Sequence, residues 1–118
     1  MKEDAILKKQ IVDIVMKFEE DQMWITPALI SVALEPRLII VTLQGITSRA
    51  EKHYAESDNG RSLLMQLYDR LFESVKQLLE RAIAQTMGTD VERASLSVDP
   101  NTGRGVMMFS LTDKVHCR

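Results

Sequence analysis

Apolar residues between Asn59 and Met87 recur at three- and four-residue spacing, which is the period of a helix and not of a strand. Charged and amide residues fill the opposite side, so the stretch predicts one long amphipathic helix. Ser57 and Asp58 precede it as capping residues, and Gly88 follows it as a residue that ends helices in the left-handed conformation. We expect the core and the dimer contact of this helix to be formed by Leu64, Leu67, Leu71, Phe72, Val75 and Leu79.

The rest of the pattern predicts six further elements around this helix. One-sided apolar spacing favours an N-terminal helix, although the β-branched run from Ile11 to Val15 leaves a strand as the alternative. Apolar runs separated by turn residues predict two hairpins. The six elements are a helix at Glu3–Gln22, strands at Ala28–Leu34 and Leu38–Gln44, a short helix at Arg49–Glu56, and strands at Val91–Val98 and Gly105–Leu111.

This order, α-β-β-α-α-β-β, predicts an α+β fold. A four-stranded, largely antiparallel sheet is packed by the long helix and the N-terminal helix. A chain of 118 residues fits a single domain, residues 1–118. The strand from Leu38 to Leu43 is almost continuously apolar, which is typical of a strand covered on both faces. Trp24 lies in the connector after the first helix, where it either covers an edge of the core or marks a contact surface.

Composition narrows the choice of partner and compartment. The net charge of −2, with basic and acidic residues intermixed, argues against nucleic acid, which requires a basic surface. The sequence contains no apolar run long enough to span a membrane, so we expect no direct membrane insertion. The charged start does not resemble a signal peptide, and the single Cys117 fits a reducing compartment. We therefore expect a cytoplasmic protein.

The residues that could carry chemistry are few and scattered. His53, His116 and Cys117 are too few and too widely spaced for a structural metal site. Ser48 and Ser57 are better explained as helix caps than as nucleophiles. We therefore predict no catalytic, cofactor-binding or metal-binding residues, and no cofactor.

One weaker hypothesis concerns the start of the long helix. Gly60 and Arg61 combine a helix N-terminus with a cation, and this combination can bind an anion. The alternative is that Arg61 pairs with a nearby carboxylate, either Glu56 or Asp58.

Several short motifs follow one another along the chain. They are Gly45-Ile46-Thr47-Ser48-Arg49-Ala50-Glu51-Lys52, Gly60-Arg61-Ser62-Leu63-Leu64, Gly88-Thr89-Asp90-Val91, Ser97-Val98-Asp99 and Val106-Met107-Met108-Phe109-Ser110-Leu111. These motifs and their order resemble those of the MpsC family of small bacterial proteins. The chain departs from the family pattern at two places. Members usually have Gly-Arg-Gly-Pro after the first helix, where this chain has Met23-Trp24-Ile25-Thr26-Pro27. They also have Thr-Pro where this chain has Ser48-Arg49.

The resemblance implies a role but supplies no catalytic residues. The family is named for a cation-translocating system that generates membrane potential, so it implies a non-enzymatic accessory or regulatory protein, with a membrane complex as its partner. A sensor of anions or small molecules, and an enzyme of unknown type, remain alternatives. The apolar arc of the long helix spans about 200°, wider than the stripe of about 100° that one packed face requires. This surplus, with apolar residues on both faces of the strand Leu38–Leu43, predicts a homodimer.

Overall fold

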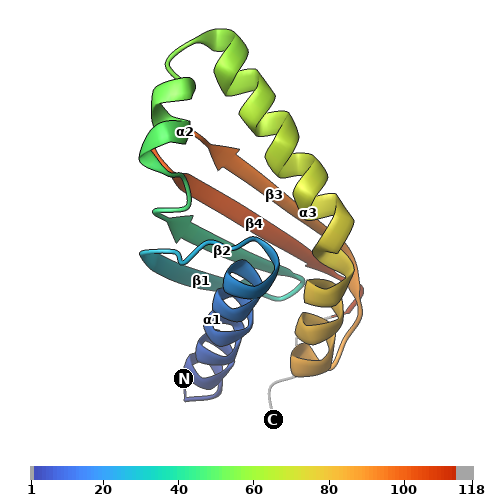
Figure 1. The fold of residues 1–118 in the computed structure, drawn as a ribbon. Coiled ribbons are helices and arrows are strands. Elements are labelled where there is room, and N and C mark those ends of the chain that lie inside the picture. Colours follow the sequence, from blue (N-terminus) through green and yellow to red (C-terminus); the bar gives the residue numbers. More distant parts are fainter. Residues whose placement is uncertain (1, 114–118) are drawn as a thin grey trace.

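The computed structural model describes residues 2–113 and confirms the predicted α+β fold with its α-β-β-α-α-β-β order (Figure 1). The predicted tail from Thr112 to Arg118 lies largely outside the described residues, and so do His116 and Cys117. The elements are α1 (Lys2–Gln22), β1 (Leu29–Glu35), β2 (Leu38–Gln44), α2 (Arg49–Tyr54), α3 (Asp58–Met87), β3 (Val91–Asp99) and β4 (Arg104–Leu111).

The four strands form one antiparallel sheet in the order β1-β2-β4-β3, so that β2 and β4 lie at its centre. Both long helices cross the same face of this sheet (Figure 1). α1 packs over β1, and α3 packs over β3. On the two central strands, the side chains that lie under the helices are fully buried. They are Ile39, Val41, Leu43, Met107 and Phe109.

The ends of α3 confirm the capping residues that the sequence predicts. Ser57 is the N-cap, and its Oγ accepts a hydrogen bond from the Gly60 backbone N–H at 3.0 Å. Gly88 ends the helix in the left-handed conformation with φ of 70°, and its N–H donates to the Ala84 carbonyl. The sequence places the helix boundaries well because these residues satisfy backbone groups that the helix itself leaves unpaired.

The N-terminal segment Ile11–Val15 is helical, because α1 buries Ile11, Val15 and Phe18 on one side. The Phe18 ring meets Phe72 of α3 edge-on, with ring centroids 6.2 Å apart. Burial of this apolar stripe outweighs the modest helix-forming tendency of β-branched residues.

The prediction that both faces of the strand Leu38–Leu43 are covered is wrong. Its side chains alternate between fully buried on the helix side and half-buried on the other side, where Leu38, Ile40 and Thr42 lie. No helix within residues 2–113 covers that second face, which we call the open face (Figure 1). The apolar run misleads because neighbouring strands shelter the open-face side chains without removing them fully from water.

The connector after α1 contains an unusual backbone conformation. Trp24 has φ of 58°, in the left-handed region that bulky residues rarely adopt. Its side chain is 88% exposed, so it does not cover an edge of the core. The backbone N–H groups of Met23 and Ile25 both donate to the Glu19 carbonyl, which fixes the chain on either side of it.

Candidate functional site

The widest exposed apolar surface of α3 consists of four leucines, which we call the leucine face. They lie within about 80° of one another on a wheel of 3.6 residues per turn. Their exposed fractions range from 43% to 53%. The residues of the leucine face are Leu63, Leu67, Leu71 and Leu78.

Most of the leucine face lies beyond the reach of α1, which is shorter than α3. With 21 and 30 residues, the two helices are about 31 and 45 Å long. α1 lies beside the C-terminal half of α3, and the N-terminal half extends beyond it towards α2 (Figure 1). α1 therefore does not extend along the N-terminal half of α3, which carries Leu63, Leu67 and Leu71.

The residues predicted to face the core along α3 divide into two groups. Leu64, Phe72 and Leu79 are buried, and Val75 is half-buried. Leu67 and Leu71 are exposed, so they are not core residues, and their assignment to a dimer contact stays a prediction. On a wheel of 3.6 residues per turn, Leu67 lies about 140° and Leu71 about 100° from Phe72, which faces the sheet. The sequence argument also left Leu63 and Leu78 out of the site, although they share the same flank.

The C-terminal end of the leucine face borders a shallow hollow between α1 and α3. It has a volume of about 280 Å³. Ile14, Phe18, Leu79 and Ala82 form its apolar wall, and Lys17 and Asp21 stand at its rim. Leu78 of the leucine face also lines this hollow.

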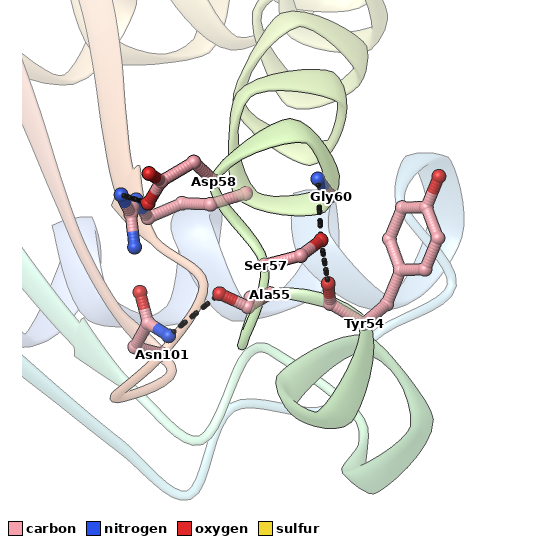
Figure 2. A network of polar contacts seen from close by, with 7 residues as sticks. Tyr54, Ala55, Ser57, Asp58, Gly60 and Asn101 are labelled. Atoms are coloured by element: carbon pink, nitrogen blue, oxygen red, sulfur yellow. Dashed lines mark hydrogen bonds and ion pairs between the residues drawn. The ribbon is translucent and has the colours of Figure 1, made fainter.

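A second candidate region is the polar corner, where α2 and the start of α3 meet the β3–β4 turn. Figure 2 shows Ser57 between Gly60 and Tyr54, with Asn101 beside Ala55. The Ser57 hydroxyl donates to the Tyr54 carbonyl at 3.4 Å, and the Asn101 side-chain amide donates to the Ala55 carbonyl at 3.0 Å. These bonds tie the α2–α3 junction to the turn that follows β3.

The start of α2 has a complete capping box. Ser48 Oγ accepts from the Glu51 backbone N–H at 3.1 Å, and Glu51 Oε1 accepts from the Ser48 N–H at 2.8 Å. The other carboxylate oxygen of Glu51 accepts a hydrogen bond from the Tyr68 hydroxyl of α3. Burial raises the pKa of Glu51, but the hydrogen bonds from Tyr68 and Ser48 outweigh it and lower the pKa below its usual 4.5.

Gly60 and Arg61 lie in this corner, and both already have local partners. The Arg61 guanidinium donates to Asp58 Oδ1 at 2.7 Å, which is one of the alternatives left open by the sequence. A Cβ on Gly60 would lie 2.0 Å from the Tyr54 carbonyl oxygen, so only glycine fits there. Anion binding at Gly60 and Arg61 stays a prediction, and any anion would compete with Asp58 for Arg61.

Two of the five motifs through which the chain resembles the MpsC family, residues 45–52 and 60–64, lie around α2 and the start of α3. Ser48 and Glu51 close the capping box, and Gly60 allows close approach of α2 and α3. These positions therefore have a structural explanation in building the corner.

Two further groups bear on possible chemistry. His53 is exposed and lies 3.6 Å from Glu56. Within residues 2–113, no three His, Cys, Asp or Glu side chains gather where they could hold a metal ion. None of the helices in this range combines the length and hydropathy needed to cross a membrane.

One buried carboxyl group stands apart from both regions. Glu19 of α1 is 1% exposed, and its Oε1 forms no hydrogen bond within the described part of the chain. Burial raises its pKa from 4.5 to about 7.

Comparison with known proteins gives one match. Residues 4–113 match the family model described as "Na+-translocating membrane potential-generating system (MpsC)". No curated protein and no solved structure matches the chain. Because the matched range covers nearly all of its 118 residues, this chain belongs to the MpsC family.

Proposed function

We propose that this chain is a non-enzymatic accessory protein that acts by binding other protein chains, in association with a Na⁺-translocating membrane system. The observation that carries the proposal is the leucine face. Four leucines, each about half exposed, follow one flank of the longest helix. Contiguous exposed apolar surface of this kind is typical of protein interaction sites.

The polar groups of the molecule support a binding role over catalysis. Ser48 and Ser57 are engaged as helix caps, and Glu51 joins Ser48 to Tyr68. The family description supplies the membrane system as the setting. We place the protein in the cytoplasm, where it would reach the inner surface of that system, and we propose that it works as a homodimer.

A sedimentation experiment tests the membrane association. Purified protein is mixed with inverted membrane vesicles from cells that carry the Na⁺-translocating system, and with vesicles from cells that lack it. We expect the protein to sediment only with the first. The double variant Leu67→Lys/Leu71→Lys is expected to stay in the supernatant, because two cations would have to be buried in the contact.

The control is Gln66→Lys, which adds one cation at an exposed polar position of the same helix. It should sediment like the wild type. Equal sedimentation with both kinds of vesicle, or sedimentation unaffected by the leucine substitutions, would contradict the proposal.

A further inference from the structure

The open face of the sheet has an ordered pattern of charge. Cross-strand partners place its outward side chains in rows that run over β1, β2, β4 and β3. Two adjacent rows contain no charged residue on any of the four strands. The first row is Ala33, Ile40, Met108 and Ser95, and the second is Ser31, Thr42, Val106 and Ser97.

The neighbouring row has opposite charges at its two ends. It consists of Glu35, Leu38, Ser110 and Arg93. Glu35 lies on the β1 edge and Arg93 on the β3 edge, separated by three strand spacings, or about 14 Å. Both side chains are exposed, and neither forms an ion pair within the described part of the chain.

We propose that the open face binds a second copy of this chain, sheet against sheet, about a twofold axis parallel to the strands and midway between β2 and β4. This axis places β1 of one copy opposite β3 of the other, and each row opposite itself in reverse order. Glu35 of each copy then faces Arg93 of the other. One symmetric contact thus provides two ion pairs, which is the charge complementarity that two copies require.

The same axis brings the apolar centres of the two faces together. Ile40 of one copy lies opposite Met108 of the other, and Thr42 lies opposite Val106. Met108 is 40% exposed, so its flexible side chain has room to fill the space between the sheets. The outer positions of these rows are serines and an alanine, whose small size permits the usual separation of about 10 Å between packed sheets.

The contact is small, so the dimer should depend on concentration. Four strands and three rows make a footprint of roughly 15 by 20 Å, below the 800 Å² or so that each partner buries in a standard interface. We therefore expect dissociation on dilution and a contact that weakens in high salt.

This inference rests on the homodimer within the proposed function and assigns its two surfaces. The open face holds the second copy, while the leucine face, on the helix side of the sheet, stays free for the membrane partner. A dimer would then present two leucine faces, one on each outer side of the paired sheets.

Charge reversal tests the arrangement directly. Glu35→Arg places two arginines opposite each other at both ion-pair positions, and Arg93→Glu does the same with two carboxylates. Each variant alone should dimerise roughly tenfold more weakly, or worse, because symmetry doubles the repulsion. An equal mixture of the two should recover wild-type affinity, because both contacts in the mixed dimer pair opposite charges. Sedimentation equilibrium over a concentration series gives the dissociation constants.

Control variants separate this inference from the proposed function. Arg81→Glu reverses an exposed charge on α3 and should leave the dimer unchanged, as should Leu67→Lys/Leu71→Lys. The arrangement would be overturned if Glu35→Arg and Arg93→Glu each dimerised with wild-type affinity. It would also be overturned if their mixture failed to recover that affinity. A dimer broken by the leucine variant would overturn the arrangement and keep the homodimer. A wild type with a mass of 13.4 kDa at every concentration would overturn both, while the vesicle result would still stand.

Discussion

The two faces of the sheet take their central side chains from the same two strands, but they differ in what covers them. On the helix side, Val41, Met107 and Phe109 are fully buried under α1 and α3. On the open face, Ile40 and Met108 occupy the matching central positions without a helix above them. Similar hydrophobicity therefore leads to two outcomes. One face stabilises the fold, and the other is available to bind.

The largest expected effect comes from comparing substitutions at Met108 and Phe109, which are adjacent on β4 and lie on opposite faces of the sheet. Phe109→Ala should lower the free energy of unfolding by about 3–5 kcal/mol, because it leaves a cavity in the core. Met108→Ala should lower it by only about 0.5 kcal/mol, because that side chain already contacts water. Urea unfolding at low protein concentration, where no dimer forms, measures both. Equal losses would show that the open face contributes to the core after all.

The buried carboxyl group of α1 sharpens the comparison through pH. The pKa of Glu19 is about 7 in the folded state, compared with 4.5 for an ordinary glutamate, which represents the unfolded chain. Folding therefore favours the protonated form. Its contribution to stability is full below about pH 4.5 and is lost as the pH rises to about 7, a total of about 3 kcal/mol.

Glu19→Gln removes this dependence because the amide cannot ionise. We expect the variant to match the wild type near pH 4 and to exceed it by about 3 kcal/mol near pH 8. Chemical denaturation at the two pH values is the measurement. Parallel stability curves for both proteins would mean that Glu19 is solvated or paired in the folded state.

A smaller effect is expected for Leu71 of α3, which is exposed although the next residue in the chain is buried. Leu71→Asp should cost no more than about 1 kcal/mol, because Leu71 is exposed on the leucine face. Phe72→Asp should abolish folding, because it places a charge among apolar side chains. Thermal melts compare the two. A collapse of the Leu71 variant would show that this flank is buried in the folded protein.

The smallest effect is expected at the polar corner. Arg61→Ala should change stability by about 0.5 kcal/mol or less, because it removes one exposed ion pair with Asp58. If an anion binds at Gly60 and Arg61, the same substitution should weaken sulfate binding and reduce its salt sensitivity. Sulfate titrations of both proteins, followed by thermal shift, decide this. Superimposable curves would dispose of the anion site.

The sequence predicts the elements well where a local signal marks them. Ser48, Ser57 and Gly88 were assigned correctly because a cap is decided by one residue and its immediate neighbours. Burial of Leu71 and of both faces of the strand Leu38–Leu43 was assigned wrongly. Both depend on which elements lie above a surface, and the sequence does not show that both helices cross the same face.

The leucine face and the open face could be predicted only in part from the sequence. The wide apolar arc of α3 pointed to surplus surface, but which leucines remain exposed depends on how the sheet and α1 lie against α3. The charge pattern of the open face depends on strand order, since Glu35 and Arg93 share a row only because β4 lies between β2 and β3.

Trp24 gives the molecule a built-in optical reporter. It is the single tryptophan, and its indole is almost wholly in water at the end of α1. Its fluorescence should therefore be close to that of a free indole already in the native protein, so global unfolding will change the emission little. A partner protein that binds over the connector and buries Trp24 would instead shift the emission to shorter wavelength. Tryptophan fluorescence of this protein will thus report binding at the connector after α1, and it will change little when the core unfolds.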